Sequence, residues 1–331
     1  MTQPTASGMD EAAPPHRRRI LLAVQVLASA ALITYLIARM EPEDTRSIVR
    51  HVRSIEWMSA VPLALLVAGT GAASIVASGF RLHAVARRRG ADLSVIDAVQ
   101  VNCLGLLASV FTPLGLVGDG LRGMLLVRRH RVHVRDSVAC VVTDRVAGLI
   151  ASCIVAGTGL LFAPQVPRAT DAIRVLQLTT AIVIGGVLVI IGFAAWMRAA
   201  GSSGNGRWRS RIRRFEVVDL GALRSPVVIG AGLIGQLLET VSAMAVLWLF
   251  GFHRTPVAYI AVVSSFLPIL EALPAAFIGI GAREGALEYL LVQVGEPIGA
   301  GVVVGTAGLT IRIAVVVITF LVARSGYGEN W

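Results

Sequence analysis

Residues 113–122 read PLGLVGDGLR, and residues 274–283 repeat the same spacing of proline, glycine and arginine in PAAFIGIGAR. Each copy lies in an apolar stretch, where proline and glycine weaken a helix and a charged side chain is costly. A weaker echo follows each copy, first as Thr143-Asp144-Arg145 and then as Thr310-Ile311-Arg312. Two matching interruptions, one in each half of a membrane protein, are typical of a transport site.

The composition is that of a membrane protein. Hydrophobic residues make up 55% of the chain, charged residues only 15%, and the mean hydropathy is +0.75. Several apolar runs exceed the roughly 18 residues that mark a membrane-spanning helix. We therefore predict an all-α integral membrane protein with about six spanning helices, near 20–38, 57–80, 137–163, 175–197, 226–250 and 297–323.

The net charge of +10 comes from a chain whose basic residues are all arginine. On a membrane protein such charge sets topology and contacts anionic lipid headgroups, so nucleic acid is not expected as a partner. The cysteines, Cys103, Cys140 and Cys153, have neither disulfide nor metal-ligand spacing. Neither a metal nor a cofactor is expected, and the sequence leaves the oligomeric state open.

Arginine placement predicts the topology. Arginines at 17–19 place the N-terminus, including a disordered tail at 1–16, in the cytoplasm. If the interrupted segment 94–127 crossed the membrane, the arginines that follow it would lie outside. We therefore predict that this segment enters and returns as a re-entrant hairpin, and that segment 256–295 does the same from the other side.

This topology makes residues 17–324 a single polytopic membrane domain. Its half-repeats, near 57–163 and 226–323, have opposite orientation, which is the inverted-repeat plan of many transporters. An arginine-rich cytoplasmic loop at 198–225 joins them, and both termini are expected in the cytoplasm. No polar stretch is long enough for a separate catalytic domain, so we do not expect an enzyme.

Each motif is expected to form a hairpin tip at membrane depth. Non-helical backbone there must line a cavity or lie buried in protein, because lipid cannot hydrogen-bond its amides. The helix that follows each tip would point its N-terminus at the membrane centre, where it attracts an anion, and the adjacent arginine adds a fork for phosphate. The expected tip residues are Pro113, Gly118, Gly120, Pro274, Gly279 and Gly281.

Arg122 and Arg283 are the expected substrate contacts. Asp119 is placed to cap the first half-helix, and Glu284 opens the second. Asp144 and Arg145 point about 100° apart on a helix, so each needs a partner elsewhere. Two alternatives remain: these side chains pair with other buried charges, or they contact the substrate. If one of them pairs with the first hairpin, that pair would hold the hairpin in place.

Three further acids, Glu239, Glu271 and Glu288, lie at apparent membrane depth. They could couple transport to protons, because burial raises the pKa of a carboxyl group. The alternative is pairing with a nearby arginine such as Arg283 or Arg312. Gln100, Asn102 and Gln236 are expected to hydrogen-bond between packed helices rather than to bind a ligand.

The motifs resemble a known family. Three stretches are similar to signatures of the lysylphosphatidylglycerol synthase transmembrane region: Thr112-Pro113 through Gly118-Asp119-x-x-Arg122, Asp144-Arg145-x-x-Gly148, and Leu273-Pro274 through Gly279-x-Gly281-x-Arg283-Glu284-Gly285. The resemblance covers roughly 20–323. It implies the flippase-like domain of the multiple peptide resistance factor type, which moves lipids between leaflets of the bacterial inner membrane.

We therefore expect a lipid translocase for a phospholipid or a polyprenyl-phosphate lipid, with anionic membrane lipids as its partners. Fused family members carry a cytosolic aminoacyl-transferase domain, and without one a lipid aminoacyl- or glycosyl-transferase activity is disfavoured here. The alternatives are a small-anion or proton-coupled transporter and a membrane partner of an envelope-synthesis enzyme.

Overall fold

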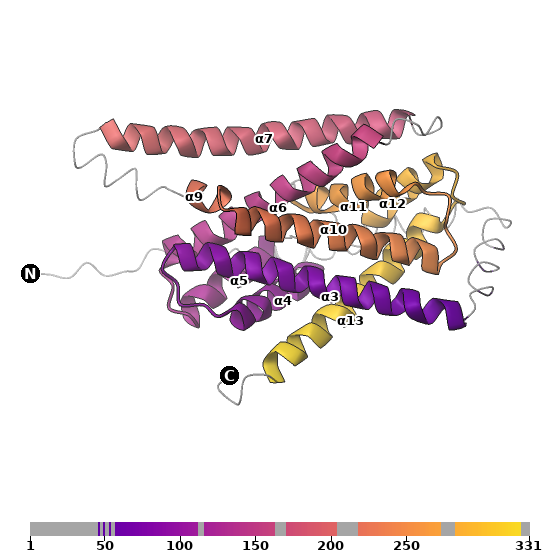
Figure 1. Ribbon diagram of the computed structural model, residues 1–331, viewed down its shortest axis with the longest axis horizontal. Helices are drawn as coiled ribbons and strands as arrows, with labels where there is room; N and C mark the ends of the chain where they lie inside the picture. Colours follow the sequence, from indigo (N-terminus) through magenta and orange to yellow (C-terminus); the bar gives the residue numbers. More distant parts are fainter. Residues whose placement is uncertain are drawn as a thin grey trace, which may run out of the picture.

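The computed structural model describes residues 57–111, 116–162, 170–203, 218–272 and 282–325, together with Arg46, Val49 and Arg53. Within these ranges the regular elements are all helices, which confirms the all-α class (Figure 1). Among the described residues, five helices are long and apolar enough to cross a membrane: α3 (Trp57–Arg88), α6 (Val134–Phe162), α7 (Thr170–Ser203), α10 (Pro226–Leu249) and α13 (Ala300–Ser325).

These helices match five of the six predicted spans. The predicted span at 20–38 and the tail at 1–16 lie outside the described residues. Helix α3 continues to Arg88, eight residues past its predicted end at 80. Helix α7 continues to Ser203, so the start of the predicted loop 198–225 is helical; within the described part of that loop lies the short helix α9 (Leu220–Leu223).

Each interrupted segment contains two short helices. The first holds α4 (Val95–Phe111) and α5 (Leu116–Arg128), and the second holds α11 (Val257–Ala272) and α12 (Ala282–Gln293). Helices α4 and α5 run antiparallel, since Gly105 lies against Arg122 while Ser109 lies against Gly118. The hydroxyl group of Tyr259, near the start of α11, donates to the carbonyl oxygen of Leu290, near the end of α12, at 2.9 Å.

The helices of the two halves pack reciprocally. Helix α3 of the first half packs along α10 of the second, α4 packs on α13, and α6 packs on α11. The pair α4 and α5 lies toward the end of the bundle where α3 ends, whereas α11 and α12 lie toward the opposite end, where α10 ends (Figure 1). Helix α7 runs along the outside. This arrangement agrees with the inverted-repeat interpretation, which remains a prediction.

Small residues let these helices approach closely. On α10, Gly235 faces Ala77 and the carbonyl oxygen of Ser74, and the Ser74 hydroxyl donates to the carbonyl oxygen of Gly235 at 3.1 Å. On α6, a Cβ at Gly159 would meet the carbonyl oxygen of Ala258 on α11 at 2.8 Å, which real side chains do not do. Without water to drive association, such close packing and interhelical hydrogen bonds hold membrane helices together.

Candidate functional site

A cavity of about 250 Å³ lies between the two halves. Its walls come from α3, α4, α5 and α6 of the first half and from α10, α11, α12 and α13 of the second. Five arginines line it, and Glu239 is the one acid among the described lining residues. The cavity therefore brings together both motif arginines, Arg122 and Arg283, both echo arginines, Arg145 and Arg312, and a fifth, Arg81.

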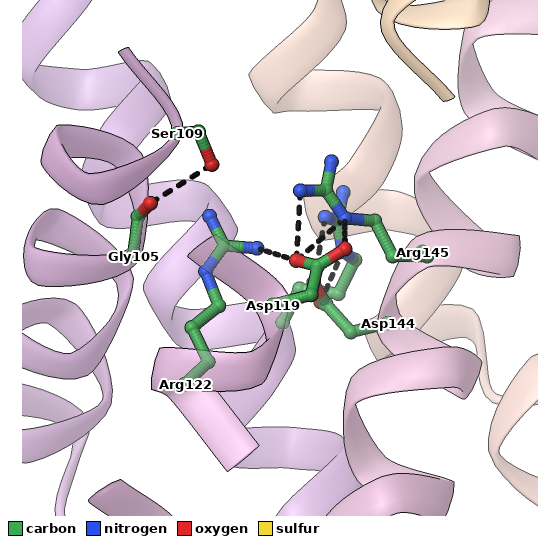
Figure 2. A network of polar contacts seen from close by, with 7 residues as sticks. Gly105, Ser109, Asp119, Arg122, Asp144 and Arg145 are labelled. Carbon is green, nitrogen blue, oxygen red and sulfur yellow. Dashed lines mark hydrogen bonds and ion pairs between the residues drawn. The ribbon is translucent and has the colours of Figure 1, made fainter. Parts of the chain in front are cut away.

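Arg122 and Arg145 share one carboxylate (Figure 2). The Asp119 side chain lies between them, with Oδ1 at 3.3 Å from Arg122 Nη1 and at 2.7 Å from Arg145 Nη2. Arg145 Nε also donates to Asp119 Oδ2 at 2.8 Å. One carboxylate thus contacts two guanidinium groups from different helices.

Asp119 does not have its predicted role as a helix cap. Helix α5 begins at Leu116, so Asp119 lies in the first turn and directs its carboxylate at the two arginines. The pairing confirms that Arg145 contacts the first hairpin. An arginine on a long spanning helix thereby fixes α5 against α6.

Gly105 provides the space in which Arg122 lies. A Cβ at this position would overlap the Cγ, Cδ and Nε atoms of Arg122. The guanidinium group passes beside α4 and reaches Asp119, and the whole residue is only 4% exposed (Figure 2). Arg122 Nε has no acceptor among the described residues. A buried cation with a remaining donor is suited to a ligand that carries negative charge.

Gly118 and Gly120 both lie within α5, so their predicted place in a non-helical tip is wrong. Gly118 packs against α4, where a Cβ would overlap the Ser109 hydroxyl and the carbonyl oxygen of Gly105. A Cβ at Gly120 would meet no atom within 4 Å. The first glycine is therefore required by helix packing and the second is not. Pro113, the other tip residue, lies outside the described residues.

Asp144 pairs with Arg81 rather than with the hairpin. Arg81 Nε donates to Asp144 Oδ1 at 2.7 Å, and Arg81 Nη2 donates to Oδ2 at 3.3 Å, which makes the contact bidentate. Both side chains are largely buried. Arg81 was not predicted as a member of the site. Arg81 lies two turns before Arg88 on α3, and this helical spacing places it inside the bundle.

Glu239 and Arg312 form a second ion pair in the cavity wall, with Oε1 at 3.2 Å from Nη1. The Ser74 hydroxyl also donates to Glu239 Oε2 at 3.4 Å. Of the alternatives for Glu239, pairing with Arg312 is therefore confirmed. Glu288 has a different partner: its carboxylate accepts hydrogen bonds from the amides of Gly299 and Gly301 at the start of α13.

The second motif is described from Ala282 onward. Arg283 lines the cavity, and Glu284 is fully buried, with its side chain 2.8 Å from the position of a Cβ at Gly305 on α13. Pro274, Gly279 and Gly281 lie outside the described residues, as does the side chain of Glu271.

The predicted interhelical hydrogen bonds are present. Gln100 donates to the carbonyl oxygen of Ala323, Asn102 to that of Ile75, and Gln236 accepts from the Ser152 hydroxyl at 2.9 Å. Four polar residues that were not predicted as site residues also line the cavity: Asn102, Gln236, Ser74 and Ser152. Their polar character inside apolar helices was a usable signal, but it does not distinguish helix packing from ligand contact.

Residues 22–323 match the family model described as the lysylphosphatidylglycerol synthase TM region. The chain belongs to this family. The match covers both motif copies and, except for the last two residues of α13, the described helices, and it relates the chain to membrane lipids. No curated protein and no solved structure matches the chain.

Proposed function

We propose that this chain of the lysylphosphatidylglycerol synthase TM region family is a lipid translocase. It moves a phosphate-bearing lipid, either a phospholipid or a polyprenyl phosphate, between membrane leaflets. The observation that carries the proposal is the cavity between the halves, which is lined by arginines from both motif copies. Guanidinium groups suit phosphate because their fork of donors matches its oxygens and their charge persists when buried.

The size of the cavity also favours a headgroup as the ligand. Its volume of about 250 Å³ is slightly below the roughly 300–1,000 Å³ of sites that enclose drug-sized molecules. A phosphate with a small substituent fits this space, while the acyl or prenyl chains would stay in the bilayer. Packing of each half's hairpin on the last helix of the other supports movement of the halves against each other around a central site.

The proposed location is the bacterial inner membrane, with both termini in the cytoplasm. Arginines gather at the end of the bundle where α3 ends and α5 returns: Arg87, Arg88, Arg89, Arg128, Arg129 and Arg131. An excess of positive charge favours the cytoplasmic side. A reporter that is active only in the periplasm, fused after Arg324, is expected to be inactive.

Leaflet exchange of a labelled anionic lipid in reconstituted vesicles tests the translocase proposal. The wild-type chain is expected to accelerate exchange over protein-free vesicles. Arg122→Ala and Arg283→Ala are each expected to slow it by about tenfold or more, because a hydrogen bond to a charged group contributes roughly 1.5–3 kcal/mol. Arg174→Ala is the control, since Arg174 is exposed on α7 and is absent from the cavity wall.

If wild-type vesicles exchange lipid no faster than empty vesicles, the translocase proposal fails. If they do exchange lipid but Arg122→Ala and Arg283→Ala match Arg174→Ala, the site assignment fails.

A second candidate is a proton-coupled transporter of small anions, and Glu239 is the observation that favours it. This acid lines the cavity beside Arg312, so its protonation would release that arginine. Uptake of a soluble anion driven by a pH gradient, and lost in Glu239→Gln, would support this function. Uptake of the anion without any exchange of lipid would favour the anion transporter over the translocase.

A further inference from the structure

Besides its five arginines, the cavity wall carries neutral hydrogen-bonding side chains among residues that are mainly apolar. Hydroxyl and amide side chains reach it from α3, α6, α10 and α11, among them Ser74, Ser152, Gln236 and Ser264. Hydroxyl groups can donate or accept, and an amide offers two donors on its nitrogen. These four side chains form a polar, uncharged patch of the wall, and Gln236 lies midway along α10 rather than at a helix end.

Gln236 is the member of this wall with an unused donor. The side chain is 8% exposed, and its Oε1 accepts a hydrogen bond from the Ser152 hydroxyl. Its Nε2 has no acceptor among the described residues. A buried polar group without a partner costs roughly 1–3 kcal/mol. A ligand oxygen in the cavity would remove that cost.

The charges of the cavity exclude one class of headgroup. Five arginines line it, and Glu239 is the one acid among the described lining residues. That acid already contacts Arg312 and Ser74. An ammonium group has three donors and no acceptor, so it would face like charge and compete with existing partners. The wall thus favours oxygen-rich neutral groups over amines.

We propose that the cavity selects a lipid whose phosphate carries a neutral hydroxylated group, a polyol or a sugar, and that Gln236 binds this group while the arginines bind the phosphate. The inference rests on the proposed translocase function and adds the class of headgroup. It assigns Gln236 a role in specificity as well as in helix packing.

Leaflet exchange of lipids that differ only in the headgroup tests the charge argument. Phosphatidylglycerol carries a neutral polyol, phosphatidylethanolamine carries an ammonium group, and phosphatidic acid carries the phosphate alone. The wild-type chain is expected to exchange phosphatidylglycerol at least about tenfold faster than phosphatidylethanolamine. A tenfold ratio corresponds to a free-energy difference of about 1.4 kcal/mol between the two lipids. A short-chain polyprenyl phosphate that carries one hexose tests whether the neutral group is a sugar. Faster exchange of either hydroxylated lipid than of phosphatidylethanolamine supports the proposal.

Gln236→Leu tests the residue assignment. It removes the amide but keeps a side chain of similar size, so exchange of the preferred hydroxylated lipid is expected to fall about tenfold. Exchange of phosphatidic acid should stay unchanged, because that lipid has no group for Gln236 to bind. Gln293→Leu is the matched control, since Gln293 ends α12 and does not line the cavity.

The outcomes separate the two proposals. No accelerated exchange of any lipid would overturn the translocase function itself. Equal wild-type rates for phosphatidylglycerol, hexosyl polyprenyl phosphate and phosphatidylethanolamine would overturn the inferred headgroup class while leaving translocation intact. An equal loss for phosphatidic acid and the hydroxylated lipid in Gln236→Leu would show that Gln236 only packs the helices. The wild-type comparison stands even if that variant fails to fold.

Discussion

At the scale of the residue, burial distinguishes the two kinds of ion pair in the cavity wall. Arg81 and Asp144 have side chains only 12% and 5% exposed, whereas Arg312 and Glu239 are 31% and 28% exposed. A buried charge that loses its partner keeps its full desolvation cost, while a more exposed one regains water. The two pairs should therefore respond very differently to removal of the acid.

Asp144→Asn is expected to destabilise the protein strongly, by about 3–5 kcal/mol, because it leaves Arg81 buried without its bidentate partner. Glu239→Gln should cost no more than about 1 kcal/mol. Thermal unfolding of both variants in the same detergent measures the difference. Equal shifts of the midpoint would contradict the role given to burial.

The sequence identified most charged members of the site but not their partners. Arg122, Arg145, Arg283 and Arg312 were predicted at membrane depth, and all line the cavity. Arg81 was missed because linear position placed it with the arginines at the end of the helix. Pairing depends on which helices lie side by side, so the contact of Asp144 with Arg81 required the fold.

At the scale of the element, the first hairpin depends on close contact between α4 and α5. The contact consists of Gly118 against Gly105 and Ser109 on one side and of Arg122 beside Gly105 on the other. Repeated glycines in the sequence indicated a broken helix, and helices α4 and α5 are separate. The same glycines could not show whether they serve a turn or a close helix contact, because both need the absence of a side chain.

Gly118→Ala and Gly120→Ala form a matched pair that tests this packing. The methyl group of Gly118→Ala would overlap backbone of α4, so it should destabilise the protein by about 1–3 kcal/mol. Gly120→Ala meets open space and should be neutral, or stabilising by up to about 1 kcal/mol through helix propensity. Thermal midpoints in detergent report both. A destabilised Gly120→Ala beside an unaffected Gly118→Ala would contradict the assignment.

At the scale of the whole molecule, the two halves contribute to one cavity. Helices α3 and α10 pack along each other, and each half's hairpin packs on the last helix of the other half. This reciprocal arrangement places Arg122 and Arg283, separated by 161 positions in the sequence, in the same wall. Internal repetition predicted matching elements, but only the packing of the halves could show that they share a space.

Binding of a soluble phosphate ester tests the shared site most directly. Calorimetric titration of the detergent-solubilised chain with glycerol 3-phosphate is expected to give one bound molecule per chain. Arg122→Ala and Arg283→Ala should each weaken that binding by about tenfold or more, and Arg174→Ala should leave it unchanged. Two bound molecules per chain, or a loss confined to one of the two motif variants, would contradict a single site formed by both halves.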